Sequence, residues 1–287
     1  MPVKEEHGSA TQIGKSLAPS IIDLVASLRR SIGSATEDST LAINTPFRSL
    51  NEFLGPLREF VVFAGPPGAG KSAMVHQICI SSAIKDIPVL LVDFEHYWQF
   101  LILRLLSGYF NRTIEEVKTS LMSDSVILPP GLKAMSVWSS RAVTPQDIRL
   151  NLLALGADTR PSILAIDSLQ KLPAVPGSQP REKTDIWLRE LEDIKNRFPV
   201  TILCVSELSR GEGGRNYSSP AIYAFKESGD IEYTARQALC ILPVQDQKPE
   251  DAEDFNVFVT KNTFGRTGKV PAVFSQANFL RWRWEEI

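Results

Sequence analysis

Short apolar runs alternate with amphipathic stretches along most of the chain. Uninterrupted runs of Val, Ile, Leu and Phe are typical of strands that a parallel sheet buries on both faces, whereas apolar residues three or four positions apart are typical of helices. The predicted strands are 60–64, 88–94, 134–138, 161–166, 200–205 and 238–244. The predicted helices are 72–83, 95–109, 145–156, 182–197 and 225–234. This order predicts an α/β fold in which helices flank a mostly parallel central sheet.

The pattern changes near the end of the chain, where shorter apolar stretches surround a polar turn. The expected strands are 255–261, 270–274 and 279–284, with a turn at 264–268. This arrangement predicts antiparallel hairpins. In the last strand Leu280, Trp282 and Trp284 share one face. Interleaved arginines and tryptophans also suit stacking on bases, but this alternation favours a strand that packs on the core.

The first 40 residues differ from the rest of the chain. Residues 1–18 are polar and of mixed charge, which predicts disorder and does not resemble a signal peptide. Residues 20–32 have apolar positions at helical spacing, and 33–40 read as a polar linker. This helix would either fold back on its own domain or dock on a neighbouring subunit. One α/β domain is expected over residues 41–287.

Composition and charge narrow the possible functions. The net charge of −2 gives no global attraction for nucleic acid, so a DNA site would need a local basic patch. Cys79, Cys204 and Cys240 lie in apolar stretches, which predicts buried, reduced thiols in a cytoplasmic protein. His76 and His96 belong to no Cys/His cluster, so the sequence assigns them no metal. No apolar run approaches the roughly 18 residues of a membrane span, so no membrane partner is expected.

The clearest chemical motif follows the strand 60–64. Residues 65–72 match G-x-x-x-x-G-K-[ST], the P-loop, whose backbone N–H groups surround phosphate oxygens at a helix N-terminus. Lys71 would reach the β- and γ-phosphates, and Ser72 would ligate Mg²⁺. A chance Gly/Pro turn is the alternative, but strand, loop and helix occur in the required order. The expected nucleotide-binding residues of this loop are Gly65, Pro66, Pro67, Gly68, Ala69, Gly70, Lys71 and Ser72.

Two carboxylates complete the expected site for ATP or GTP. Asp167 ends an apolar strand, where the C-terminal edge of a parallel sheet faces bound phosphates, and it suits Mg²⁺. Glu95 follows the strand 88–94. If that strand lies next to the P-loop strand, Glu95 is near the γ-phosphate as a general base for water. A surface glutamate or helix N-cap is the alternative. Tyr97 and Trp98 belong either to the core or to the surroundings of the nucleotide.

With the P-loop, further stretches resemble the RecA-like motor domain of DnaB-type hexameric replicative helicases. They are PVLLVDFE (88–95), QFLILRLLS (99–107), AIDSLQ (165–170), VSELSR (205–210), FKESGDIE (225–232) and KNTFGRTG (261–268), in the family's order. Residues 41–57 resemble the start of that domain, and 20–32 resemble the linker helix that docks on the adjacent subunit. The resemblance covers roughly residues 18–285 and identifies 41–287 as a RecA-like P-loop ATPase domain.

The resemblance implies an oligomer, expected to be a hexamer, held together by the linker helix and by ATP sites between subunits. Single-stranded DNA would pass through its centre. Lys71, Ser72 and Asp167 would bind MgATP, and Glu95 would be the catalytic glutamate. ATP hydrolysis would then drive DNA movement in replication.

The same resemblance extends to a Gly-rich loop at 209–219. It implies that Arg210 and Arg215 contact DNA phosphates without reading the base sequence. An exposed, solvated loop is the alternative interpretation of these two arginines.

The chain departs from the family at three places. Glu207 replaces the glutamine that senses the γ-phosphate, and a carboxylate there would repel phosphate unless it is protonated or faces a cation. Thr263 replaces the arginine finger, whose contribution to the rate is about 10³–10⁵ where it has been measured. Arg266, in the same turn, is the expected substitute. About 20 residues precede the linker helix, so we expect no primase-recruiting domain, which suggests a plasmid, phage or other mobile-element protein.

Three functions follow from these residues. The first is an ATP-dependent helicase or translocase on single-stranded DNA. The second is a RecA-fold regulatory or recombination-mediator ATPase of the RadA or KaiC type without helicase activity, which Glu207 and Thr263 favour. The third is a nucleotide-binding interaction subunit. The complete set of hydrolytic residues argues against the third function.

Overall fold

The computed structural model describes residues 42–123, 125–140, 142–174, 182–208, 229–244, 254–275 and 281–283 of the 287-residue chain. The chain divides into two units, Met1–Ser39 and Thr40–Ile287, and all described residues belong to the second. The expected helix at 20–32 lies outside the described residues. So does the loop at 209–219 with Arg210 and Arg215.

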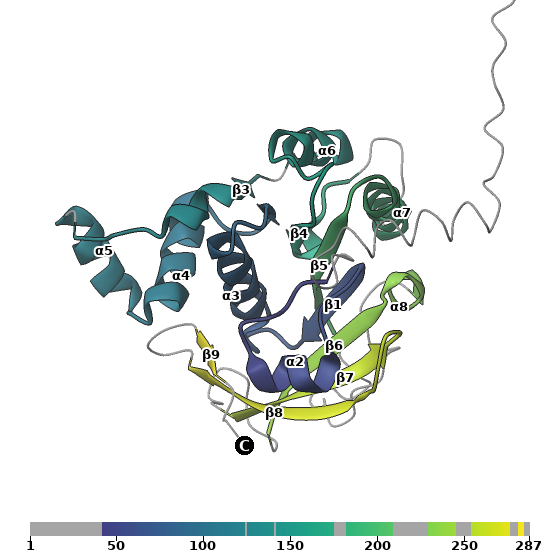
Figure 1. Ribbon diagram of the computed structural model, residues 1–287. Helices are drawn as coiled ribbons and strands as arrows, with labels where there is room; N and C mark the ends of the chain where they lie inside the picture. Colours follow the sequence, from purple (N-terminus) through teal and green to yellow (C-terminus); the bar gives the residue numbers. More distant parts are fainter. Residues whose placement is uncertain are drawn as a thin grey trace, which may run out of the picture. The chain divides into compact units, whose positions relative to one another are not determined.

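A nine-stranded sheet forms the centre of the described part, in the order β3-β2-β4-β5-β1-β6-β7-β8-β9 (Figure 1). The parallel strands, in this order, are β3 (Met135–Ser139), β2 (Val89–Asp93), β4 (Ser162–Asp167), β5 (Val200–Glu207), β1 (Phe60–Gly65) and β6 (Gln237–Pro243). The antiparallel strands are β7 (Asp254–Asn262), β8 (Gly268–Ser275) and β9 (Arg281–Arg283). This mixed sheet confirms the predicted fold class.

Two hydrophobic clusters cover the two faces of the sheet, because successive side chains of a strand point to opposite faces. Val61 and Phe63 of β1 belong to one cluster, and Phe60 and Val62 belong to the other. The helices of the first cluster are α2 (Arg48–Leu54), α3 (Lys71–Ile84) and α4 (Trp98–Phe110). Those of the second are α6 (Pro145–Ala154), α7 (Glu182–Arg197) and α8 (Gly229–Thr234). Burial on both faces explains the uninterrupted apolar runs of the central strands.

Several helical boundaries differ from the sequence-based expectations. Helix α2 and the capped helix α5 (Ile114–Met122) were not predicted. Helix α4 begins at Trp98 and not at Glu95, because Asp93 Oδ1 accepts the backbone N–H groups of Glu95 and His96, each at 2.7 Å. A side-chain acceptor of this kind holds the chain in a turn and delays the helix.

The buried aromatic and sulfur-containing residues follow most expectations. Trp282 is 1% exposed and packs on the core, as its strand face predicts. The thiols of Cys79, Cys204 and Cys240 are free and buried, as predicted. Tyr97 and Trp98 are 85% and 60% exposed, which rules out the first of the two alternatives, that they belong to the core. None of the helices in the described ranges combines the length and apolar character needed to cross a membrane.

The position of β2 corrects one expectation about the site. Strands β4 and β5 lie between β2 and the P-loop strand β1, so β2 is not its neighbour. The order of strands in a sheet depends on crossover connections, which a linear pattern does not encode. Strand β2 instead pairs with β4, and the Phe94 N–H donates to the Asp167 carbonyl at 2.8 Å. This pairing places the residues that follow β2 beside the end of β4.

Candidate active site

A polar cavity of about 300 Å³ lies where the central parallel strands end. The residues of the expected site that line it are Pro67, Gly68, Gly70, Lys71, Ser72, Glu95, Asp167 and Glu207. Gly65 ends β1 and Ala69 is fully buried in the same loop. The fold therefore brings together the loop after β1, the ends of β4 and β5, and the turn after β2.

The loop at 65–72 has the backbone that a phosphate site needs. Gly68 and Gly70 have φ values of 81° and 72°, in the left-handed region that favours glycine. Helix α3 begins directly after Gly70, so its N-terminus and its unpaired N–H groups face the cavity. The loop therefore offers an anion site built from backbone donors.

The side chain of Lys71 is largely buried beneath this loop. Its Nζ donates to the Pro66 carbonyl at 2.9 Å. Burial lowers the pKa of Lys71, and the negative charges of Asp167, Glu207 and Glu95 oppose that shift. The Lys71 amine therefore lies among three carboxylates, at a position from which it can bind a phosphate group in the cavity.

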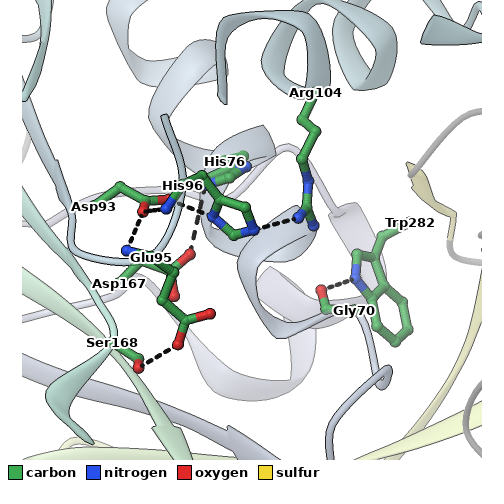
Figure 2. Close-up of polar contacts among 9 residues, drawn as sticks. All are labelled: Gly70, His76, Asp93, Glu95, His96, Arg104, Asp167, Ser168 and Trp282. Atoms are coloured by element: carbon green, nitrogen blue, oxygen red, sulfur yellow. Dashed lines mark hydrogen bonds and ion pairs between the residues drawn. The ribbon is translucent and has the colours of Figure 1, made fainter. Parts of the chain in front are cut away.

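Aromatic residues of the C-terminal hairpin support the loop, which was not predicted. The Trp282 Nε1–H donates to the Gly70 carbonyl at 2.8 Å (Figure 2). Phe274 stacks on Trp282, with ring centroids 4.9 Å apart, and also lines the cavity. The sequence indicated that Trp282 is buried but held no signal for its partner, because the two residues lie 212 positions apart.

Ser72 and Asp167 provide oxygen atoms of the kind that Mg²⁺ prefers. Asp167 is 2% exposed, and its side chain accepts a hydrogen bond from Ser72. Burial and the nearby negative charge of Asp93 raise the pKa of Asp167 to about 6, although Ser72 opposes this shift. Its Oδ2 is buried and has no hydrogen-bond partner among the described residues. A buried carboxylate oxygen without a hydrogen-bond partner can bind a cation.

Glu95 reaches the cavity from the exposed turn after β2. Its Oε1 accepts a hydrogen bond from Ser168 Oγ at 3.2 Å, and Ser168 directly follows Asp167 (Figure 2). Its backbone N–H is held by Asp93. Glu95 thus lines the same cavity as Lys71 even though β2 is not the neighbour of β1, and its carboxylate can accept a proton from water there.

A chain of three residues beside Glu95 was not predicted. His96 Nδ1 lies 3.0 Å from Asp93 Oδ2, and His96 Nε2 lies 3.0 Å from Arg104 Nη1 (Figure 2). Arginine is always a donor, so Nε2 accepts and Nδ1 carries the proton that it donates to Asp93. Burial alone would raise the pKa of Asp93, but hydrogen bonds from His96 and from the Glu95 N–H lower it. Asp93 within an otherwise apolar strand was the signal that could have found this group.

Glu207, at the end of β5, also lines the cavity. Its backbone N–H donates to Gln170 Oε1 at 3.0 Å, and Gln170 Nε2 donates to Ser206 Oγ at 3.1 Å. Burial lowers the pKa of Lys71, and the negative charge of Glu207 opposes that shift. The Glu207 carboxylate therefore lies close enough to the Lys71 ammonium to interact with it. Facing a cation is one of the two conditions under which a carboxylate is expected to be tolerated beside bound phosphate.

Arg266 is exposed and does not line this cavity. Its guanidinium carbon lies 4.3 Å from the centroid of the Phe53 ring, and its Nε donates to the Phe53 carbonyl at 3.2 Å. The turn that carries it is also tied to α2, because Asn262 Nδ2 donates to the carbonyls of Leu54 and Arg266. Arg266 is thus positioned by the helix of its own chain.

The chain is similar in sequence to bacterial replicative helicases. The replicative DNA helicase DnaB of Mycoplasma pneumoniae is 26% identical over 239 residues, which are 74% of this chain and 50% of that protein. The replicative DNA helicase DnaC of Bacillus subtilis is 23% identical over 286 residues, which are 94% of this chain and 62% of that protein. This chain therefore spans 50% to 62% of the length of these two relatives.

Structural similarity extends over nearly the whole chain. A solved ATPase domain superimposes with a TM-score of 0.75 at 19% identity, covering 94% of this chain and all of that domain. A DnaB-like replicative helicase, solved in a study of its interactions with primase, superimposes with a TM-score of 0.74 at 19% identity, covering 93% of this chain and 69% of that one. These likenesses show that the chain shares the RecA-like fold of the two solved structures. The family described as the DnaB-like helicase C terminal domain matches residues 42–282. Because that match covers most of the sequence, the chain belongs to the DnaB-like helicase C-terminal domain family.

Proposed function

We propose that this chain is the ATP-hydrolysing motor of a DnaB-type replicative helicase, which couples hydrolysis to movement along single-stranded DNA. The observation that supports this function best is the convergence of Lys71, Ser72, Asp167 and Glu95 on one cavity. These side chains come from three separate segments of the chain. Together they supply the charge, the metal ligands and the base that phosphoryl transfer to water requires.

The P-loop residues 65–72 bind the phosphates of ATP through backbone N–H groups at the start of α3. Lys71 leaves the Pro66 carbonyl and contacts the β- and γ-phosphates. Ser72 and Asp167 would hold Mg²⁺, which would neutralise charge on the phosphate oxygens. The buried Asp167 carboxylate, whose Oδ2 has no hydrogen-bond partner in the described part of the chain, fits that role.

Glu95 acts as the general base of the proposed reaction. The oxygen of a water molecule attacks the γ-phosphorus, the bond to the β–γ bridging oxygen breaks, and the proton of the water passes to Glu95. Ser168, which donates to Glu95 Oε1, orients the carboxylate. Glu207 takes the place of a γ-phosphate sensor, with its charge balanced by Lys71. The products are ADP and inorganic phosphate.

The remaining roles require a second subunit or DNA. We propose a homo-hexamer in which the helix expected at 20–32 docks on the neighbouring subunit. Arg266, held by Phe53 on an exposed turn, acts across the ATP interface in place of the arginine that Thr263 replaces. Arg210 and Arg215 are proposed DNA contacts, and they lie outside the described residues.

ATP hydrolysis with and without single-stranded DNA tests this function. The full chain is expected to hydrolyse ATP faster when single-stranded DNA is present. Lys71→Ala should abolish hydrolysis, and Glu95→Gln should lower turnover by about 10²–10⁴-fold while ATP binding persists. Glu52→Gln, a matched change at an exposed carboxylate on α2, should have no effect.

Two outcomes would contradict the proposal. Full activity of Glu95→Gln would remove the assigned base. Slow hydrolysis that ignores single-stranded DNA in an oligomeric preparation would instead indicate a RecA-fold regulatory ATPase.

A further inference from the structure

Three buried side chains meet where α3, the helix that follows the P-loop, passes the ends of β2 and β4. They are His76 on α3, Asp93 at the end of β2 and Asp167 at the end of β4, and they are 4%, 0% and 2% exposed (Figure 2). One ligand atom from each lies within 4.8 Å of the other two. His76 has no role in the hydrolysis described above, and Asp93 only holds the backbone N–H of Glu95, so the cluster of the three side chains needs a separate explanation.

Two atoms of the cluster lack a hydrogen bond. His76 Nε2 and Asp167 Oδ2 are both buried, and neither has a hydrogen-bond partner in the described part of the chain. They face each other at 3.7 Å, which is longer than the 2.7–3.2 Å typical of an N–H···O hydrogen bond. Burial of an unpaired polar atom is unfavourable, so these atoms indicate that something else binds between them.

The charges of the cluster favour a cation. Asp93 and Asp167 are register partners on adjacent strands, so two carboxylates are buried side by side. Burial and the positive charge of Arg104 lower the pKa of His76 to about 3, which leaves its imidazole neutral and able to coordinate. Arg104 itself bonds to His96. Two buried negative charges beside a neutral imidazole are stabilised by a proton or by a metal ion.

We propose that His76, Asp93 and Asp167 bind a divalent transition-metal ion of the Zn²⁺ or Co²⁺ class. One imidazole nitrogen and two carboxylate oxygens suit these ions, whereas Mg²⁺ and Ca²⁺ prefer oxygen ligands alone. Zn–N and Zn–O bonds are about 2.0–2.2 Å, so two ligand atoms of a tetrahedral site lie about 3.3–3.6 Å apart. The three side chains must therefore close slightly on binding.

Existing hydrogen bonds already orient one of the proposed ligands. Asp93 Oδ1 accepts two backbone N–H groups, and Asp93 Oδ2 accepts from His96, which is fixed in turn by Arg104. Metal-binding carboxylates and imidazoles are commonly oriented by such partners. Asp167 also borders the nucleotide cavity, which gives the ion a route into the cluster.

Because Asp167 also accepts from Ser72, the two metal sites would share one carboxylate. The transition-metal site does not depend on the proposed ATPase, since its occupancy can be measured without nucleotide. Loss of ATPase activity and loss of metal binding are therefore distinguishable results.

The test is a titration of the full, tag-free chain with Co²⁺, followed by visible absorption spectroscopy. We expect a single ion per chain with a nitrogen-containing ligand set. His76→Leu should weaken this binding by more than the roughly 10–100-fold that is typical when a residue that only orients a ligand is lost. The chain has three histidines, so His7→Ala serves as the matched control and should bind Co²⁺ normally. The three buried cysteines should not contribute.

Thermal unfolding shows whether the variants are folded and whether the ion is bound by the native state. Zn²⁺ should raise the Tm of the wild type, because a ligand that binds only the folded state stabilises it. His76→Leu should unfold cooperatively, since leucine suits a buried helix position, but Zn²⁺ should not shift its Tm. Two outcomes would overturn the site: wild type that does not bind Co²⁺, or binding that survives His76→Leu and disappears with His7→Ala. The pair of His76 and Asp167 would then hold a proton or a water molecule.

Discussion

The indole N–H of Trp282 donates a hydrogen bond to the main-chain carbonyl of Gly70, with 2.8 Å between the nitrogen and the oxygen. Trp282 lies on β9, the last described strand. Gly70 is the N-cap of α3, the helix whose N-terminus forms the anion site together with the P-loop. A segment near the C-terminus thus fixes the backbone that is expected to contact phosphate. The geometry of the loop therefore depends on the antiparallel edge of the sheet as well as on its own glycines.

Trp282→Phe should keep the aromatic packing and remove this one hydrogen bond. Phenylalanine can still stack on Phe274 but cannot donate to Gly70. We expect the free energy of unfolding to fall by about 1 kcal/mol, because a hydrogen bond typically contributes roughly 0.5–1.5 kcal/mol, and nucleotide affinity to fall as well. Denaturant unfolding and a nucleotide titration would measure the two effects.

The exposed residue Trp98 supplies a matched control for that change. Trp98 is 60% exposed, so Trp98→Phe should leave the unfolding free energy within about 0.5 kcal/mol of the wild-type value. Equal effects of the two substitutions would show that the Trp282 hydrogen bond does not support the loop.

Gly70→Ala should damage the loop in two separable ways. Gly70 has a φ of 72°, where a Cβ costs about 1–2 kcal/mol. A Cβ at this position would also lie 2.8 Å from the Phe274 ring, so the loop or the ring must move. Gly156 has a similar φ of 68°, but a Cβ there would meet no described atom within 4 Å. We therefore expect Gly70→Ala to lower the free energy of unfolding more than Gly156→Ala, and only Gly70→Ala to abolish nucleotide binding. Similar losses in both variants would contradict the clash with Phe274.

Much of this site was predictable because it depends on local sequence. The strand that ends at Asp167 and the antiparallel C-terminal strands are encoded in short stretches, and the structure confirms them. The P-loop motif is equally local, and it lies in the turn between β1 and α3. The position of Glu95 beside the cavity was also expected, although the reason given for it, a β2 strand adjacent to β1, was wrong.

The parts that could not be predicted depend on distant segments meeting. His76, Asp93 and Asp167 belong to three different elements, so no single stretch of the sequence shows that they meet. The delayed start of α4 depends on a side-chain acceptor at Asp93, which competes with helix formation and is invisible to apolar periodicity. Arg266 was identified from its place in a motif, but its contacts with Phe53 come from a helix that the pattern did not predict.

Asp167→Asn should stabilise the protein more at pH 8 than at pH 4. The pKa of Asp167 is raised from 3.8 to about 6 in the folded state, so the folded protein holds this proton more tightly than the unfolded chain does. The stabilising effect of the group is therefore present below pH 3.8 and is lost as the pH rises through about 6. Asparagine does not ionise, so Asp167→Asn should raise the free energy of unfolding at pH 8 by roughly 1–3 kcal/mol. This range follows because a tenfold change in proton affinity corresponds to about 1.4 kcal/mol. Urea unfolding of both proteins at several pH values would measure the difference.

Asp193 on α7 provides a control with the opposite sign. Hydrogen bonds from Arg149 and Arg197 lower the pKa of this exposed carboxylate. Its contribution to stability is present above the ordinary carboxyl pKa and is lost as the pH falls through the lowered value. Asp193→Asn should therefore destabilise the protein at pH 8 and have less effect in acid. The same pH dependence for both variants would contradict the raised pKa of Asp167.

Arg266→Ala should slow ATP hydrolysis without weakening ATP binding, if this arginine acts on the site of a neighbouring subunit. Its contacts with Phe53 hold it on an exposed turn of its own chain, outside the cavity that contains Lys71. An arginine finger contributes about 10³–10⁵ in rate, so we expect a fall in turnover approaching this range in the assembled protein. Arg48→Ala, which removes an exposed arginine from the adjacent helix α2, should leave turnover unchanged.

Mixing Arg266→Ala with Lys71→Ala subunits separates a role of Arg266 on the neighbouring subunit from a structural role in its own. Such mixtures should regain activity, because a Lys71→Ala subunit can supply its Arg266 to the intact P-loop of its neighbour. ATP turnover of the mixture, measured beside that of each variant alone, checks this expectation. Mixtures as inactive as the separate variants would place the effect of Arg266 within its own subunit.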